Sequence, residues 1–287
     1  MRQDWAVSLS PFSSATRKWF SSTFDAPTEA QSGAWRAIAS GENALVVAPT
    51  GSGKTLAAFL WSIDRLAAAA VPPKKERLRV LYISPLKALA VDIERNLRSP
   101  LTGIEAAAAR LGATLSPIVV GVRTGDTPPE DRRRMLTAPP DILITTPESL
   151  FLLLTSQARD ALRHIDAVII DEVHAVAGTK RGAHLALSLE RLDELLPTPA
   201  QRIGLSATVR PLEEMATFLG GGRPVTIVES RARKELDISV VVPVEDMSRL
   251  DEVAPAGADA EEKSSIWPAV ESAFFAVSLS LLMKSDQ

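Results

Sequence analysis

The chain has 287 residues and 46% hydrophobic content, which is enough apolar surface for one large domain or two small ones. A formal net charge of −3 excludes a globally positive surface, so any nucleic-acid contact must come from local patches and backbone donors. The absence of cysteine excludes disulfides and thiolate metal sites and favours a reducing, cytoplasmic setting. No stretch of about 18 apolar residues and no signal-peptide core occur, so no membrane association is expected.

Apolar runs rich in β-branched residues recur along the chain and predict strands, at residues 43–48, 79–84, 117–122, 141–145, 166–170, 202–206 and 225–228. Longer alanine- and leucine-rich segments between them predict helices, at residues 55–70, 86–97, 104–111, 148–155, 183–196 and 212–219. Strand and helix alternate. This alternation is typical of an α/β fold whose mostly parallel sheet carries helices on both faces.

A glycine-rich segment, Ala-Pro-Thr-Gly-Ser-Gly-Lys-Thr at residues 48–55, follows the first predicted strand and opens the first predicted helix. Glycines allow a tight turn that aims N–H groups at an anion, and the helix N-terminus adds positive potential. Lys54 supplies a mobile charge and Thr55 offers a hydroxyl to Mg²⁺. The sequence therefore predicts ATP or another nucleoside triphosphate, held with Mg²⁺ by Thr50, Gly51, Ser52, Gly53, Lys54 and Thr55. The alternative is an ordinary strand-to-helix turn with a surface lysine.

Two carboxylates, Asp171 and Glu172, follow the apolar strand predicted at residues 166–170. Asp171 is expected to hold Mg²⁺ through water, and Glu172 to orient and deprotonate the attacking water. The alternative is that the pair only begins a solvated loop. Because ligands of parallel sheets lie beyond the carboxyl ends of the strands, the glycine-rich segment, Asp171 and Ser206 can converge on one site.

The order of these motifs resembles the first RecA-like lobe of superfamily 2 helicases of the DEAD/DEAH-box group, in a DEVH form, and within that group the Lhr (large helicase-related) proteins of bacteria. The resemblance extends over roughly residues 10–271, and Ala48, in place of the commonest first glycine of the loop, agrees with it. The matching segments are Pro27-Thr28 with Gln31, the glycine-rich segment, Ser-Pro-Leu-Lys-Ala-Leu at 84–89, Arg-Thr-Gly-Asp-Thr at 123–127, Thr-Thr-Pro-Glu-Ser-Leu at 145–150, Asp-Glu-Val-His at 171–174 and Ser-Ala-Thr at 206–208.

This resemblance implies an ATP-dependent helicase or translocase in which Lys54, Asp171 and Glu172 serve catalysis. It implies that Gln31 reads adenine, and a carboxamide can indeed pair with N6 and N7 of that base. Phe24, upstream, either stacks on the base or is a core aromatic residue.

The same resemblance places a further group of residues in elements that contact the backbone of a DNA or RNA strand. These residues are Lys87, Arg123, Thr124, Thr146 and Pro147. For Lys87 and Arg123 a plain solvated charge is the alternative. His174, Ser206 and Thr208 would couple the ATP site to the strand. A rival interpretation, in which residues 204–208 form the nucleophile elbow of a hydrolase, lacks the second glycine and leaves the glycine-rich segment unexplained.

Three regions are expected along the chain: the ATP-binding domain at residues 1–235, a linker leading towards a second lobe at 236–271, and an aberrant tail at 272–287. A last strand is predicted at residues 238–242. No Gln-x-x-Gly-Arg-x-x-Arg element of a second lobe follows Thr208. The sequence thus predicts a truncated first lobe with little activity alone, completed by a separate or missing second lobe. A non-catalytic module that binds nucleotide and nucleic acid is the alternative.

Overall fold

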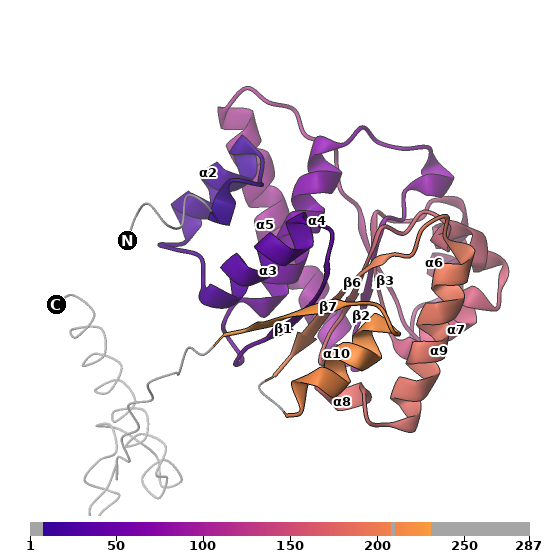
Figure 1. Cartoon of the computed structure of the whole chain (residues 1–287). Coiled ribbons are helices and arrows are strands. Elements are labelled where there is room, and N and C mark those ends of the chain that lie inside the picture. Colours follow the sequence, from indigo (N-terminus) through magenta and orange to yellow (C-terminus); the bar gives the residue numbers. More distant parts are fainter. Residues whose placement is uncertain (1–7, 208–209, 231–287) are drawn as a thin grey trace, which may run out of the picture. The chain divides into compact units, whose positions relative to one another are not determined.

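A computed structural model describes residues 8–207 and 210–230, which lie in the first of two units, Met1–Ala232, into which the chain divides. Seven parallel strands form one sheet in the order β3-β4-β2-β5-β6-β1-β7 (Figure 1). The strands are β1 (Asn43–Val47), β2 (Val80–Ile83), β3 (Val120–Arg123), β4 (Ile142–Thr145), β5 (Ala167–Ile170), β6 (Gln201–Ser206) and β7 (Val225–Glu229). The predicted parallel α/β architecture is confirmed.

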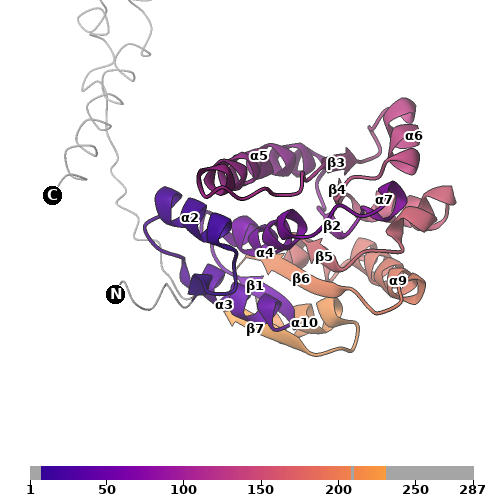
Figure 2. The ribbon, with the colours of Figure 1, turned by 90° about the horizontal axis from the view of Figure 1, so that it is seen from above.

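Helices connect the strands and cover both faces of the sheet (Figure 2). They are α2 (Ser14–Thr23), α3 (Glu29–Ala39), α4 (Lys54–Ala68), α5 (Lys87–Arg110), α6 (Pro129–Thr137), α7 (Pro147–Leu154), α8 (Val173–Val176), α9 (Lys180–Leu195) and α10 (Leu212–Gly220), with the 3-10 helices η1 (Lys74–Glu76) and η2 (Gln157–Leu162). Within the part described, none of them is long and apolar enough to cross a bilayer.

Alternating strand residues supply two separate cores, which explains why the strands are continuous apolar runs in the sequence. Val46 and Tyr82 face α2, α3, α4 and α5 on one side of the sheet. Their neighbours Val47 and Ile83 face α7, α8, α9 and α10 on the other. Figure 2 shows α4 and α5 on one face and α9 and α10 on the opposite face.

The prediction of two helices at residues 86–97 and 104–111 is wrong, because α5 is one helix that runs through Pro100. Ile93, Leu97 and Ile104 are all buried against the same core, so one apolar face continues past the proline. This packing offsets the loss of the N–H that proline cannot donate. The predicted strand at residues 238–242 lies outside the described residues.

Four α-helices, α2, α3, α6 and α8, were not predicted. Close packing on α5 holds α2 in place: a Cβ at Gly103 of α5 would collide with the indole of Trp19. The start of α3 is fixed by a capping box, in which Thr28 and Gln31 each bond the other's backbone N–H. The charged helix α6 has no buried residue, so no apolar period marks it in the sequence.

The strand order decides how the motif-bearing turns are arranged at the carboxyl edge of the sheet. The glycine-rich turn, the Asp-Glu pair and Ser206 belong to β1, β5 and β6, which lie together in one half. The turns predicted to contact nucleic acid follow β2, β4 and β3, which form the adjacent half. The two groups meet where β2 pairs with β5, with Ile83 opposite Ile170.

Candidate nucleotide site and nucleic-acid interface

The turn at residues 48–53 has the backbone shape of a phosphate loop. Gly51 and Gly53 adopt φ angles of +80° and +79°, a left-handed conformation that favours glycine. Helix α4 begins directly afterwards at Lys54, so the N–H groups of its first turn face the loop. The hydroxyl of Ser52 is one of four buried side-chain polar atoms without a partner among the described residues. These features fit a bound polyphosphate.

Lys54 lies between this loop and the two carboxylates. Its Nζ donates a hydrogen bond to the carbonyl oxygen of Ala48, which holds the ammonium group over the turn. Burial lowers the pKa of Lys54, while the charges of Glu172 and Asp171 act in the opposite direction. The ammonium therefore lies in the field of both carboxylates.

Asp171 follows β5 and is only 7% exposed. Its Oδ2 accepts a 2.5 Å hydrogen bond from the hydroxyl of Tyr82, and its Oδ1 accepts the N–H of Glu172 at 3.0 Å. Burial raises the pKa of Asp171, and the hydrogen bond from Tyr82 opposes that rise. Within the described ranges no three His, Asp or Glu side chains gather as a metal cluster. One or two carboxylates with substrate phosphates are the usual protein environment of Mg²⁺, and a single buried carboxylate at Asp171 is compatible with such an environment.

Glu172 has a φ of +46° and is the one non-glycine residue with positive φ in the ranges that the structure describes. Backbone conformations of this kind are costly and cluster at active sites. The side chain of Glu172 reaches His174, whose Nε2 lies 3.3 Å from Oε2 of Glu172.

His174 links the carboxylate pair to the end of β6. Its Nδ1 accepts the N–H of Ala207 at 3.2 Å and lies 3.2 Å from the hydroxyl of Ser206. Because a backbone N–H can only donate, Nδ1 carries no proton in this contact, and the Nε2–H faces Glu172. The structure therefore brings Glu172, His174 and Ser206 together. Thr208, the third residue predicted to couple, lies outside the described residues.

Gln31 contacts the phosphate loop directly. Its Oε1 accepts the N–H of Thr28 at 3.0 Å, and its Nε2 lies 3.5 Å from the carbonyl oxygen of Gly53. Thr28 in turn donates its hydroxyl to the carbonyl oxygen of Ser52 at 3.0 Å. The approach is so close that a Cβ at Gly53 would collide with the carboxamide of Gln31. The sequence did not predict that Thr28 and Gln31 hydrogen-bond to the backbone of the phosphate loop.

Phe24 is 40% exposed and lies at the end of α2. Its ring packs on Phe20 and Trp19, at centroid distances of 4.8 and 5.8 Å. The remaining surface lines a cavity of about 280 Å³ together with Gly53 and Thr55. The ring is thus both part of an aromatic cluster and open to the space beside the phosphate loop.

Lys87 and Arg123 come from neighbouring turns at the other half of the sheet edge. Lys87, the first residue of α5, forms a 2.8 Å ion pair with Asp126 in the turn after β3. Arg123 ends β3 and is half-buried; burial, with the nearby charge of Arg132, lowers its pKa. In that same turn the N–H of Thr124 bonds the hydroxyl of Thr127 at 2.9 Å. These contacts hold the turns after β2 and β3 together.

Thr146 and Pro147 are buried and shape the start of α7. The hydroxyl of Thr146 caps this helix by accepting the N–H of Ser149, and Pro147 occupies the first helical position. The structure therefore gives these two side chains a local structural role in the turn that was predicted to meet nucleic acid.

Arg181 is a site residue that sequence reasoning missed. Its Nη1 donates to the carbonyl oxygen of Pro85 at 2.6 Å, and its Nε lies 2.5 Å from Oε1 of Glu148. The hydrogen bond from Arg181 lowers the pKa of Glu148 to about 2. Arg181 thereby ties together the turns after β2 and β4. Its partners lie 33 and 96 residues away in the chain, so no local pattern identifies it.

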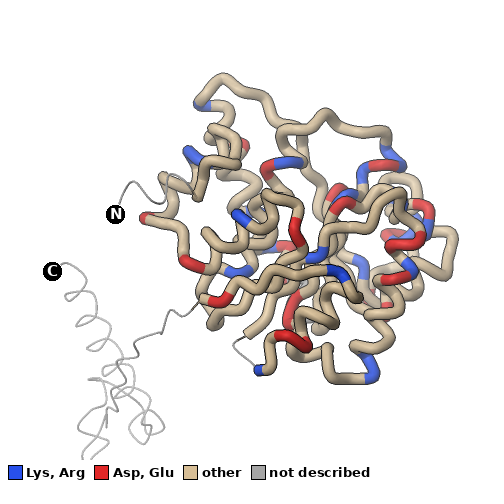
Figure 3. Tube along the Cα trace, in the orientation of Figure 1, with Lys and Arg blue, Asp and Glu red and all other residues tan. Residues whose placement is uncertain are grey.

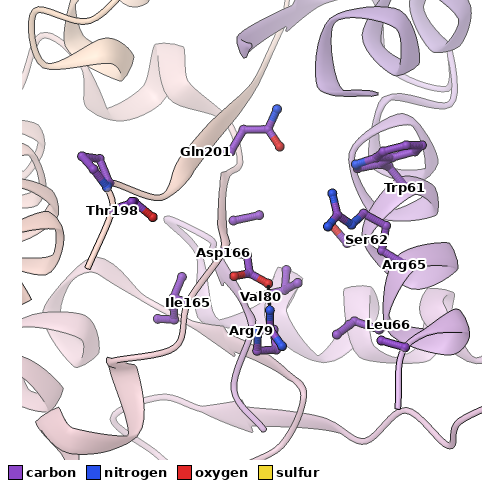
Figure 4. A pocket seen from close by; sticks show the side chains of 13 residues that line it. Trp61, Ser62, Arg65, Leu66, Arg79, Val80, Ile165, Asp166, Thr198 and Gln201 are labelled. Atoms are coloured by element: carbon purple, nitrogen blue, oxygen red, sulfur yellow. Dashed lines mark ion pairs between the residues drawn. The ribbon is translucent and has the colours of Figure 1, made fainter. Parts of the chain in front are cut away.

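A further cavity, of about 260 Å³, lies at the opposite edge of the sheet, where β2, β5 and β6 begin (Figure 4). Figure 4 shows Trp61 and Arg65 of α4 on one wall, and Arg79 forms a 2.5 Å ion pair with Asp166. None of the catalytic, nucleotide-binding or nucleic-acid-binding residues predicted from the sequence lines this cavity. The cavity is therefore separate from the candidate nucleotide site.

Charge over the described part is mixed, with basic and acidic residues interspersed along the trace (Figure 3). The local clusters at the sheet edge consequently matter more than the overall field.

A seven-stranded parallel sheet, a phosphate loop between β1 and α4, and two carboxylates after β5 together define a RecA-like lobe of the P-loop NTPase class. The model of the DEAD/DEAH box helicase family matches residues 28–215. The chain belongs to this family, and the resemblance seen in the sequence is confirmed.

Among curated proteins the chain is 62% identical over 271 residues to a Lhr helicase/probable uracil glycosylase of Mycolicibacterium smegmatis. The match covers 94% of this chain but only 17% of that relative. An ATP-dependent helicase Lhr-Core of Methanothermobacter thermautotrophicus is 50% identical over 241 residues, which is 82% of this chain and 28% of the relative. The chain thus spans less than a third of the length of either relative.

Among solved structures it resembles helicase Lhr of Mycobacterium smegmatis bound to ssDNA and AMP-PNP, with a TM-score of 0.77 and 60% identity. That match covers 95% of this chain and 33% of the other. The helicase MrfA bound to DNA and AMPPNP has a TM-score of 0.63 and 25% identity, over 77% of this chain and 29% of that chain.

Proposed function

We propose that this chain is the ATP-binding lobe of an ATP-dependent helicase or translocase that acts on a DNA or RNA strand. The observation that carries this proposal is the convergence of the phosphate loop, the two carboxylates and Ser206 at one half of the sheet edge, linked through His174. Family membership and the AMP-PNP bound in the similar Lhr helicase support it.

In this proposal the triphosphate is held by residues 50–55 and the adenine by Gln31, with Phe24 beside the base. Thr55 and Asp171 would hold Mg²⁺, whose charge offsets the negative charge that develops on the phosphoryl oxygens. Lys54 meets the phosphate oxygens with its ammonium group. Glu172 orients the attacking water and accepts its proton.

The nucleic-acid strand is proposed to lie over the turns after β2, β4 and β3, where Lys87, Arg123, Thr124, Thr146 and Pro147 are located. The ssDNA in the similar Lhr structure supports this choice of partner. His174, Ser206 and Thr208 are proposed to pass the state of the ATP site to these turns. The pairing of β2 with β5 brings the two halves of the edge together and gives these residues a short route.

The proposed domain organisation keeps an ATP-binding domain at residues 1–235, a linker at 236–271 and a tail at 272–287, and a second helicase lobe is proposed as a partner. The greater length of the relatives supports a requirement for further parts. A cytoplasmic location is proposed because the sequence has no cysteine.

The experiment is a binding and turnover assay on the 287-residue chain. Fluorescence anisotropy of labelled oligo-dT and oligo-U should show tighter strand binding with Mg²⁺ and AMP-PNP than with EDTA. Phosphate release, with and without the strand, then separates an enzyme from the alternative module. Binding of both ligands without any turnover supports the non-catalytic module, and absence of nucleotide binding refutes the proposal.

A further inference from the structure

Tyr82 lies in the middle of β2, next to β5, and its side chain is fully buried. Its ring stacks on Phe59 of α4, with the centroids 4.9 Å apart and the planes at 22°. Its hydroxyl donates the 2.5 Å hydrogen bond to Oδ2 of Asp171. The aromatic ring is therefore fixed by packing while its polar end reaches the carboxylate.

This contact completes the support of Asp171. The N–H of Glu172 bonds Oδ1 and the Tyr82 hydroxyl bonds Oδ2, so both oxygens of the carboxylate are held from the protein side. Each carboxylate oxygen can accept more than one hydrogen bond, and both therefore keep capacity for a cation or for its water.

The hydroxyl is not needed for packing. The ring of Tyr82 stacks on Phe59 within an apolar core, and a phenylalanine would keep this ring contact without the hydroxyl. A buried hydroxyl is costly unless it is paired, and the partner of this one is Asp171.

We propose that Tyr82 is a positioning residue for the Mg²⁺ site: its hydroxyl fixes the orientation of the Asp171 carboxylate so that the metal-facing lone pairs point towards the phosphate loop. The inference rests on the proposed function, in which Asp171 holds Mg²⁺. Hydrogen-bond partners of metal-binding carboxylates commonly control metal affinity in this way.

The test compares Tyr82→Phe with the wild-type chain by calorimetry of AMP-PNP binding at a series of Mg²⁺ concentrations. The Mg²⁺ concentration for half-maximal binding should rise about tenfold in the variant, while AMP-PNP affinity in EDTA stays unchanged. The matched control is Ser188→Ala in α9, which also removes a buried hydroxyl. The hydroxyl of Ser188 donates to the carbonyl oxygen of His184. This control should leave both quantities unchanged.

A second readout uses the wild-type side chain. Tyr82 is the one tyrosine of the sequence, so 3-fluorotyrosine labelling gives a single ¹⁹F NMR resonance. Adding Mg²⁺ to the AMP-PNP complex should shift this resonance, and the shift should be lost in Asp171→Asn. This measurement does not depend on the folding of Tyr82→Phe.

An unchanged half-maximal Mg²⁺ concentration in folded Tyr82→Phe overturns the inference. If that variant does not fold, the inference is overturned instead when the ¹⁹F resonance of the wild type does not shift on addition of Mg²⁺. A wild-type chain that binds no AMP-PNP at any Mg²⁺ concentration refutes the proposed function itself, which is a distinct result.

Discussion

Lys54 shows how one side chain depends on its surroundings for its role. Its ammonium bonds the Ala48 carbonyl and lies in the field of Asp171 and Glu172, ready to exchange the carbonyl for a phosphate oxygen. Lys54→Ala should therefore weaken AMP-PNP binding by about 1.5–3 kcal/mol, the contribution of a charged hydrogen bond. Calorimetry measures this loss. Lys74→Ala, which removes an exposed lysine of η1, is the control, and equal affinities in both variants would contradict the assignment.

Substitutions of the two adjacent carboxylates, Asp171 and Glu172, should have different effects on nucleotide binding and on hydrolysis. Glu172→Gln keeps an oxygen for the Nε2–H of His174 but cannot accept a proton, so hydrolysis should fall about 100-fold or more while AMP-PNP binding persists. Asp171→Asn should instead weaken nucleotide binding that requires Mg²⁺. Phosphate release and calorimetry on the same preparations measure both effects. Equal turnover by wild type and Glu172→Gln would show that another base acts.

At the scale of elements, the short helix α8, which carries His174, is held against the start of α9 by a glycine. A Cβ at Gly182 would collide with the backbone carbonyl of Val176, which cannot swing aside as a side chain can. Gly182→Ala should therefore destabilise the chain by about 1–3 kcal/mol, despite the better helix propensity of alanine.

Urea unfolding measures this change in free energy. The matched control is Gly178→Ala, four residues earlier, where an added Cβ meets nothing within 4 Å. That variant should differ from wild type by less than about 0.5 kcal/mol. Equal destabilisation of the two variants would mean that glycine flexibility, rather than close packing, matters in this segment.

The ion pair between Arg181 and Glu148 joins α9 to α7 and makes a pH-dependent contribution to stability. Because Arg181 lowers the pKa of Glu148 from 4.5 to about 2, the folded state favours the ionised carboxylate. The contribution is therefore complete above pH 4.5 and is lost as the pH falls through about 2.

Arg181→Gln should accordingly be less stable than wild type near neutral pH, and the difference should shrink at about pH 3. Since Glu148 is 55% exposed, we expect an effect of no more than about 1 kcal/mol. Urea unfolding at the two pH values tests this. A difference that stays constant with pH would assign the loss to the bond between Arg181 and Pro85 instead.

For the whole molecule, the strand order places the turns after β1, β5 and β6 beside the turns after β2, β4 and β3. The two sets of turns meet where β2 pairs with β5. One lobe nevertheless supplies only one wall of an ATP site. An arginine from an opposite wall contributes about 10³ to 10⁵ in rate to phosphoryl transfer, so the 287-residue chain alone should turn over ATP very slowly and should not unwind a tailed duplex.

Its binding to single strands should be weak, because one lobe makes few phosphate contacts, and it should weaken further as salt is added, since each contact releases a counterion. A strand-displacement assay, anisotropy at several salt concentrations and the addition of a separately expressed second lobe test these expectations. Unwinding by the chain as a monomer would contradict them.

Local sequence patterns were enough to predict the strands, the phosphate loop and the Asp171–Glu172 pair, because each is encoded within a few consecutive residues. A strand buried on both faces must be a short apolar run, and a loop that cradles phosphate must place its glycines and lysine within a few residues. The continuity of α5 was missed because Pro100 normally ends a helix, and only the shared core beneath it shows otherwise.

The distant residues that support this site could be identified only from the fold. The hydroxyl of Tyr82 reaches Asp171 across 89 residues of chain, and Arg181 reaches Pro85 across 96. Both contacts follow from the strand order, which places β2 beside β5 although many residues separate them. Periodicity and motif spacing describe how a segment folds on itself, whereas the order of strands results from how all the faces are buried together.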